Sequence, residues 1–131
     1  MHNTDKEQLV SRLRGVLRNL QVTLPDIEAS AVVTVDGITI ASQLTSSADP
    51  DRLGAMCASL LALADRAGRE VNRGRLRQLI LDGSSGPMLL THAGDTAVLA
   101  VAAAPSINLG RLILETRKVA AEVQAQLPHP G

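Results

Sequence analysis

The chain has 131 residues, 45% of them hydrophobic, and its 13 basic residues balance 13 acidic ones. This length predicts a single domain with a buried core, and zero net charge excludes the strongly basic surface of a nucleic-acid binder. The absence of Phe, Tyr and Trp removes the rings that stack on bases or flavins. We therefore expect one domain over 1–131, with its core at about 5–127 and a loose tail at 128–131.

The first predicted elements are a helix and a hairpin. Thr4, with a Glu three residues later, forms a capping-box pattern, and leucines then recur at helical spacing until Pro25 ends the helix. Two-residue alternation follows and predicts strands at 31–35 and 38–42. Between them, the Asp-Gly pair at 36–37 is a strong signal for a two-residue hairpin turn.

The rest of the chain predicts two further helices and three further strands. In chain order these are a helix at 51–72, strands at 76–81, 88–91 and 97–103, and a helix at 105–126. Both groups of strands are consecutive and tightly connected, so we expect one five-stranded antiparallel sheet with helices packed on it. The order α-β-β-α-β-β-β-α assigns the chain to the α+β class.

The second predicted helix, 51–72, carries two apolar faces. One is a wide stripe expected to cover the sheet, formed by Leu53, Met56, Cys57, Leu60, Leu61, Leu63, Ala64, Ala67 and Val71. The opposite face carries small residues where charged ones are expected, namely Gly54, Ala55, Ala58, Ser59 and Ala62. Either these residues are simply strong helix formers, or they allow a second helix to approach closely. In the second case the simplest partner is another copy of the chain.

Basic residues gather at the C-terminal end of the same helix. Between positions 66 and 77 the chain carries five arginines and one glutamate. One explanation is that cations at a helix C-terminus complement the helix macrodipole. The other is a docking patch for an acidic partner surface, formed by Arg66, Arg69 and Arg73.

The sequence lacks the motifs of common catalytic and metal sites. It has no P-loop, no Gly-x-Ser-x-Gly segment and no His or Cys pair at metal-ligand spacing, and its histidines are scattered at His2, His92 and His129. Cys57 lies on the predicted core stripe, so we expect a buried structural thiol rather than a nucleophile. We therefore expect no catalytic residues, no metal and no cofactor, in a protein that is not an enzyme.

Localisation follows from the apolar runs and the cysteine content. The longest apolar run has eight residues, at 97–104, whereas a membrane-spanning helix needs about 20. We therefore expect no direct membrane insertion. The polar N-terminus lacks the core of a signal peptide, and a single cysteine fits a reducing compartment. Together these features predict a cytoplasmic protein.

Three stretches of the sequence carry a family likeness. They are the hairpin at 31–41, the alanine-rich helical segment at 53–61, and the strand at 94–101 with the start of the last helix at 108–112. Their order and spacing resemble the roadblock family, which includes dynein light-chain roadblock domains and bacterial gliding-motility (MglB-like) proteins. The likeness extends over nearly the whole chain.

The resemblance implies a dimer, of identical or of two related chains, in which the helix at 51–72 and the strand at 76–81 of both chains join into one continuous sheet. Of the two, we expect the homodimer. The expected interface comprises Ala55, Ala58, Ser59, Ala62, Leu76, Gln78 and Ile80. The resemblance also implies a Ras-like small GTPase as partner, whose GTP hydrolysis the gliding-motility branch stimulates. The expected function is thus a non-catalytic dimeric regulator or scaffold of such a GTPase.

Other functions stay open at this stage. A small-ligand sensor of the PAS or GAF type also sets helices on an antiparallel sheet, although such pockets commonly use aromatic side chains, which this chain lacks. An adaptor that binds no GTPase would share the same fold and the same dimer. An enzyme of an uncharacterised kind is the third alternative.

Overall fold

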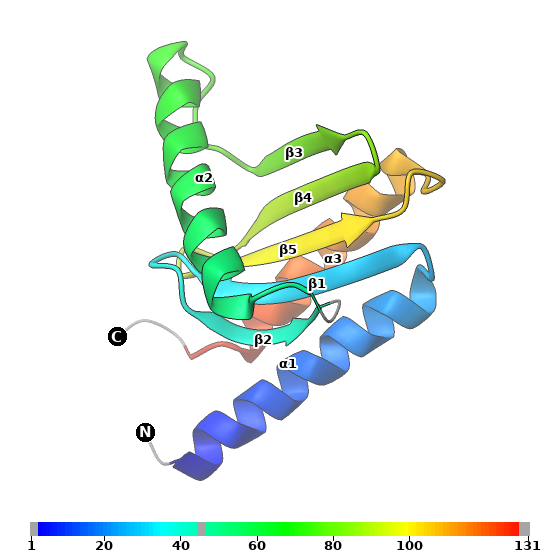
Figure 1. Cartoon of the computed structure of the whole chain (residues 1–131). Helices are drawn as coiled ribbons and strands as arrows, with labels where there is room; N and C mark the ends of the chain where they lie inside the picture. Colours follow the sequence, from blue (N-terminus) through cyan, green and yellow to red (C-terminus); the bar gives the residue numbers. More distant parts are fainter. Residues whose placement is uncertain (1–2, 45–46, 129–131) are drawn as a thin grey trace.

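The computed structural model describes residues 3–44 and 47–128. Its elements are α1 (Asn3–Thr23), β1 (Ile27–Thr34), β2 (Thr39–Gln43), α2 (Pro50–Glu70), β3 (Gln78–Gly83), β4 (Gly86–Ala93), β5 (Ala97–Ala103) and α3 (Leu109–Gln126). The five strands form one antiparallel sheet in the order β2-β1-β5-β4-β3, so β3 is an edge strand (Figure 1). The predicted fold class and order of elements are confirmed.

Helices lie on both faces of the sheet, but they cover the two faces unequally. α1 and α3 contact each other and share one face, while α2 crosses the other face and contacts chiefly β1 and β2 (Figure 1). The larger core cluster, with Leu13, Leu17 and Leu112, lies between the sheet and the helix pair. The smaller one, with Cys57 and Leu61, lies under α2. One helix alone thus has to cover a five-stranded face.

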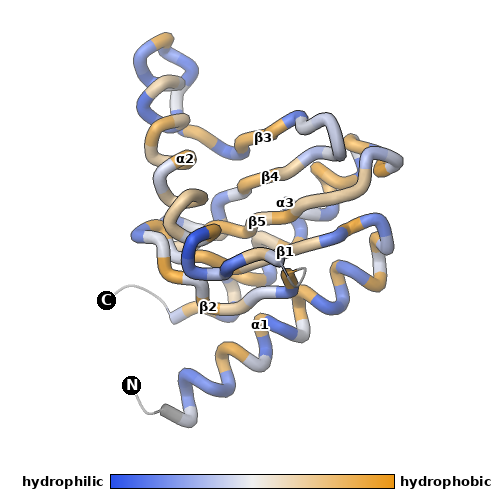
Figure 2. The backbone as a smooth tube through the Cα atoms, viewed as in Figure 1, coloured by the Kyte–Doolittle hydropathy of each residue, from blue (hydrophilic) through white to orange (hydrophobic). Residues whose placement is uncertain are grey.

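Without aromatic residues the core is filled by Leu, Val and Ala. β5 is central in the sheet and reads as a continuous apolar run, because both of its faces are buried. Figure 2 shows hydrophobic residues along β5 and an alternation of hydrophobic and hydrophilic residues along α1. This difference matches an element covered on two sides and a helix covered on one.

The first hairpin differs from its prediction in the start of its first strand and in the length of its turn. β1 begins at Ile27, four residues before the predicted strand, and the connection to β2 spans residues 35–38 rather than two residues. The pairing register shifts after Val32, and Gly37 adopts a φ of 97°. The Thr34 hydroxyl accepts a hydrogen bond from the Ile38 N–H at 3.0 Å, which stabilises the wider turn.

Two further boundaries also move, each because a side chain binds the backbone. Leu76 precedes β3 instead of opening it, because its N–H is bound by the Asp65 carboxylate at 3.3 Å. The last helix begins at Leu109, not at Pro105. Asn108 is its N-cap, and its side chain accepts a hydrogen bond from the Arg111 N–H.

Candidate functional site

α2 rests on the sheet along a narrow line. Its buried residues are Gly54, Cys57 and Leu61, so Gly54 faces the sheet and does not belong to the opposite, small-residue face to which the sequence assigned it. At Gly54 the helix approaches the β1–β2 hairpin so closely that a Cβ would lie 2.5 Å from Thr39 Oγ1 and 2.7 Å from the Gly37 carbonyl oxygen. The helix is therefore fixed by one line of small and apolar residues rather than by a broad face.

The sequence predicted that a wide apolar stripe of α2 covers the sheet. In the structure only the residues along this line are buried against it. Met56 and Leu63 are 49% and 64% exposed, and Leu60, Ala67 and Val71 are also exposed. The prediction was wrong for these residues because periodicity indicates which side of a helix is apolar but not how much of that side a neighbour covers. Here a single close approach leaves one flank of α2 without cover.

The edge strand β3 continues the uncovered surface. Leu79 and Leu81 pair with Leu90 and Met88 of β4, and Leu79 and Leu90 belong to the core cluster under α2, so this row of β3 side chains faces the α2 side. We call Met56, Leu60 and Leu63 of α2, together with Leu79 and Leu81 of β3, the open apolar face. Beside it, the outer backbone edge of β3 pairs with no strand of the described chain.

The predicted interface residues do not all share one surface. Ala55, Ser59 and Ala62 are exposed on α2, and Ala58 is half-buried there. Gln78 points to the opposite face of the sheet. Its amide donates to the hydroxyl oxygens of Thr91, at 2.7 Å, and of Thr116 in α3, at 3.3 Å. Ile80 shares this orientation, because it lies two residues further along β3, while Leu76 is half-buried ahead of the strand.

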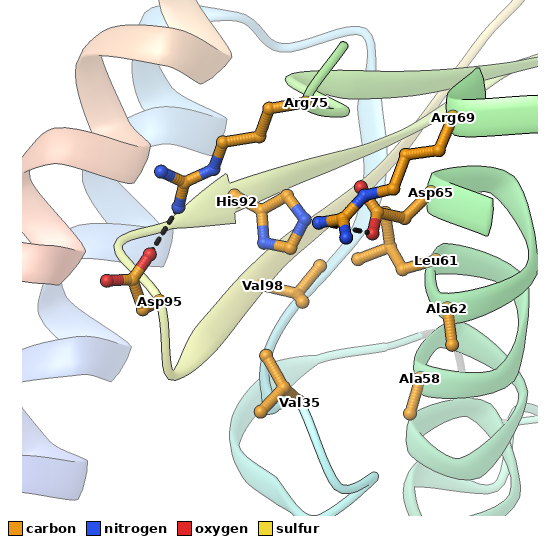
Figure 3. Close-up of a pocket in the computed structure, with 10 residues that line it drawn as sticks. All are labelled: Val35, Ala58, Leu61, Ala62, Asp65, Arg69, Arg75, His92, Asp95 and Val98. Atoms are coloured by element: carbon orange, nitrogen blue, oxygen red, sulfur yellow. Dashed lines mark hydrogen bonds and ion pairs between the residues drawn. The ribbon is translucent and has the colours of Figure 1, made fainter. Parts of the chain in front are cut away.

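The small-residue flank of α2 borders a groove of about 210 Å³ (Figure 3). Ala58 and Ala62 form one wall, Val35 from the β1–β2 turn forms the other, and Leu61 and Val98 form the floor. Because Ala side chains are short, the groove stays open beside the helix. We call this space the α2 groove.

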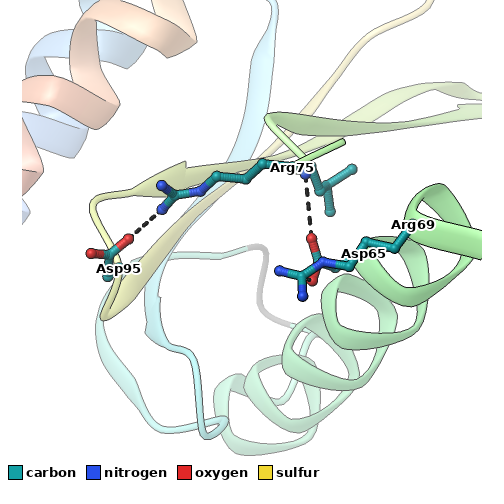
Figure 4. A network of polar contacts seen from close by, with 5 residues as sticks. Asp65, Arg69, Arg75 and Asp95 are labelled. Atoms are coloured by element: carbon teal, nitrogen blue, oxygen red, sulfur yellow. Dashed lines mark hydrogen bonds and ion pairs between the residues drawn. The ribbon is translucent and has the colours of Figure 1, made fainter. Parts of the chain in front are cut away.

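Charged residues surround one end of the α2 groove. Asp65 binds Arg69 at 3.1 Å, and Arg75 forms an ion pair with Asp95 (Figure 4). The His92 ring points toward Asp65 and Arg69 (Figure 3), and its Nδ1 is buried without a hydrogen-bond partner in residues 3–44 and 47–128. Arg75, Asp95 and Arg69 are largely exposed, and Asp65 is 27% exposed, so each ion pair adds at most about 1 kcal/mol to stability.

The arginines predicted to dock a partner lie at this end of α2. Arg66 and Arg69 are exposed, and Arg73 is held near the helix end because its Nε donates to the Val71 carbonyl oxygen at 3.1 Å. Sequence reasoning missed His92 and Arg75 as groove residues. Only the fold brings them next to α2, and no local motif marks either one.

The described residues offer little for metal or nucleophilic chemistry. Within 3–44 and 47–128 no three His, Cys, Asp or Glu side chains are grouped to hold a metal ion; His2 and His129 lie outside the described residues. Cys57 is fully buried as predicted, and burial raises the pKa of its thiol. None of the described helices is long and apolar enough to cross a membrane.

Comparison with known proteins identifies the family. The model of the Roadblock/LC7 domain matches residues 13–103. Two uncharacterised proteins of Methanocaldococcus jannaschii are each 34% identical to the chain over 99 residues, which cover 76% of this chain and 86% of each relative. The sequence likeness therefore spans most of the domain.

Solved structures agree with this assignment. A Roadblock/LC7 domain from Streptomyces avermitilis superposes with a TM-score of 0.79 at 20% identity, covering 86% of this chain and 94% of that one. The gliding protein MglB from Thermus thermophilus gives 0.79 at 16% identity, covering 90% of each chain. A structure described as MglB with a tetrameric arrangement gives 0.80 at 17% identity, covering 90% of this chain and 89% of that one. The predicted family is confirmed, and the chain belongs to the Roadblock/LC7 domain family.

Proposed function

We propose that this protein is a non-catalytic regulator or scaffold that forms a homodimer and binds a Ras-like small GTPase. The observation that carries the proposal is the narrow seat of α2, which leaves apolar or small residues accessible on both flanks of one helix. Large adjacent apolar side chains at a surface mark interaction sites. The likeness to MglB structures, one of them described as tetrameric, supports self-association.

The second copy is best placed on the open apolar face. Two β3 edges that pair antiparallel about a two-fold axis satisfy each other's free backbone groups and extend the sheet. The same operation brings Met56, Leu60 and Leu63 of both copies toward each other above the new strand pair. This arrangement uses the large apolar side chains of α2 rather than the small-residue flank that the sequence favoured.

The GTPase then binds the other flank of α2, which carries Ala58 and Ala62. The α2 groove, with Ala58 and Ala62 in its wall, lets a partner surface approach the helix backbone closely. Arg66 and Arg69 at the end of the helix supply charge that orients an acidic partner.

The test is a tagged pull-down from lysate of the source organism, with GTPγS in one half and GDP in the other. A small Ras-like GTPase retained only with GTPγS supports an effector or activating role, and turnover assays then choose between the two. Retention in both halves supports a constitutive scaffold. If no GTPase is retained in either half, the proposal is wrong, and the adaptor and ligand-sensor alternatives take its place.

The docking residues are tested separately with charge reversals. Arg66→Glu with Arg69→Glu should weaken binding of the GTPase by at least about tenfold, because like charges then face an acidic surface. Arg14→Glu with Arg18→Glu makes the same charge change on exposed positions of α1 and should leave binding unchanged. Both variants should keep the wild-type mass in light scattering. Equal affinity of all three proteins would remove Arg66 and Arg69 from the docking surface.

A further inference from the structure

We propose that a basic groove at the start of β3 binds an acidic segment of a protein partner, separately from the α2 groove. The basic groove has a volume of about 350 Å³ and lies between the end of α2, the start of β3 and the middle of α3. Its lining includes the four arginines Arg73, Arg75, Arg77 and Arg117. The connection between α2 and β3 supplies three of these arginines and α3 supplies the fourth, so two segments far apart in the sequence place guanidinium groups around one groove.

The charge of this basic groove is only partly neutralised by neighbouring residues. Arg75 is paired with Asp95, and Arg73 donates to a backbone carbonyl, but Arg77 and Arg117 form no ion pair with any residue in the described ranges. The whole chain has zero net charge, so this excess is a local feature rather than a property of the composition. A local excess of positive charge attracts a partner of opposite charge.

Apolar side chains between the arginines indicate which residues that partner presents besides its acidic ones. Ile80, which is 41% exposed, and the half-buried Ile113 lie in the same basic groove. Guanidinium forks bind carboxylates in a bidentate way, and an apolar floor accepts an aliphatic side chain. The combination fits a peptide segment in which Asp or Glu residues flank a Leu, Ile or Val.

The same features disfavour the other polyanions. A flat lipid surface cannot enter a concave groove, and the chain has no aromatic ring on which a single-stranded nucleic acid could stack. The four arginines of the basic groove also occupy one corner of the molecule, whereas duplex binding needs contacts along a phosphate backbone. An acidic protein segment remains the occupant that matches both the charge and the floor.

This surface is distinct from the one proposed for the GTPase. Ile80 and Gln78 face the α3 side of the sheet, and Gln78 binds Thr116 of α3. The α2 groove lies on the opposite side, and Arg75, through its pair with Asp95, borders both. Failure of GTPase binding therefore does not remove the basic groove, and loss of the basic groove does not remove the GTPase surface.

A second copy of the chain is the rival occupant. β3 carries Asp82 near its end, and antiparallel pairing of two β3 edges moves that residue of the other copy toward the start of this strand. Two cases are possible: either the basic groove binds an acidic segment of another protein, or Asp82 of the second copy neutralises its arginines within a dimer. These cases predict different results. In the first case substitution of the arginines changes peptide affinity alone, and in the second it changes the oligomeric mass.

The experiment measures fluorescence anisotropy of a labelled peptide of alternating Glu and Leu, with a Gln-for-Glu peptide as its control. The wild type should bind only the acidic peptide, and more weakly as salt rises. Arg77→Glu with Arg117→Glu should weaken binding by at least about tenfold, whereas Arg14→Glu with Arg18→Glu should change it less than about twofold. If circular dichroism shows that the charge reversal unfolds the chain, Arg77→Gln with Arg117→Gln makes the same comparison.

Several results would overturn the assignment. Equal weakening by the α1 variant would make the attraction non-specific, and equal binding of the Gln peptide would make it purely apolar. A change of mass in light scattering for the Arg77 and Arg117 variants would assign the basic groove to the second copy. Stronger binding to phosphatidylserine vesicles than to the peptide, lost in the same variants, would assign it to a lipid surface.

Discussion

At the scale of single residues, Gly54 fixes the position of α2 on the sheet. The absence of a side chain lets α2 lie directly on the Gly37 carbonyl and on Thr39, whose hydroxyl in turn donates to the Pro50 carbonyl oxygen at 2.7 Å. A glycine inside a helix normally costs stability relative to alanine. Here that cost is offset by a packing contact that no other residue allows.

Substitution of two glycines in the same helix should therefore have opposite effects. Gly54→Ala should lower the free energy of unfolding by about 1–3 kcal/mol, because the new Cβ collides with backbone at 2.7 Å. Gly68→Ala should raise it by up to about 1 kcal/mol, since its Cβ meets only Arg73 Cβ at 3.9 Å. Urea unfolding followed by circular dichroism measures both. Stabilisation by Gly54→Ala would show that the close approach is relaxed in solution.

Cys57 should behave as an inert thiol whose burial couples stability to pH. Because the folded state raises its pKa, the folded chain resists forming the thiolate that the unfolded chain forms in mildly alkaline solution. This contribution is complete at neutral pH and is lost as the pH rises through the thiol's ordinary range. The advantage in unfolding free energy of wild type over Cys57→Ala should therefore shrink in alkaline solution. A difference that stays constant with pH would exclude the coupling.

At the scale of elements, the sequence predicted what local chemistry decides. All eight elements were predicted in the right order, because strong turn residues and changes of hydrophobic period separate them. Two of the errors lie where a distant or neighbouring side chain binds the backbone. Asp65 binds the Leu76 N–H and delays β3, and Asn108 starts α3 later than Pro105 suggests. The contact between Asp65 and Leu76 exists only in the folded chain. The position of the Asn108 cap depends on local backbone geometry that hydrophobic periodicity does not show.

The start of α3 provides a direct check of this explanation. Asn108→Ala should destabilise the protein by about 1 kcal/mol, because the Arg111 N–H loses the side-chain oxygen that accepts it at 3.0 Å. Ser106→Ala, two residues earlier in an exposed position, should change stability by less than about 0.5 kcal/mol. Thermal and urea unfolding of both variants measure this contrast. A larger loss at Ser106 would place the functional cap nearer the predicted start.

The candidate sites could be predicted only in part, because they combine residues that only the fold brings together. The alanines of α2 and the arginines at its end were singled out from composition, and the structure places Ala58, Ala62 and Arg69 beside one groove. His92 and Arg117 could not be found, because β4 and α3 reach these grooves only through tertiary packing. The α2 residues of the open apolar face, Met56, Leu60 and Leu63, were wrongly assigned to the core, because an apolar stripe has the same sequence pattern whether a sheet or a partner covers it.

At the scale of the whole molecule, one charge on the open apolar face should separate monomer from dimer. Leu60→Glu should shift light-scattering mass toward the monomer, because a carboxylate there would be desolvated without a partner. Val22→Glu, on α1 and 79% exposed, is the matched control and should keep the wild-type mass. Ala58→Glu discriminates between the two flanks of α2. If it breaks the dimer and Leu60→Glu does not, the interface is the small-residue flank that the sequence favoured.

In the dimer that we propose, the open edge of β3 also affects which chain is taken as the second subunit. Backbone hydrogen bonds carry no side-chain identity, so an open strand edge accepts a strand of almost any sequence. Discrimination between one copy and another related chain then depends on the fit of Leu79, Leu81 and the apolar side chains of α2. When a cell makes two such chains together, their relative abundance and rate of subunit exchange, more than the strand pairing itself, set the proportion of mixed assemblies.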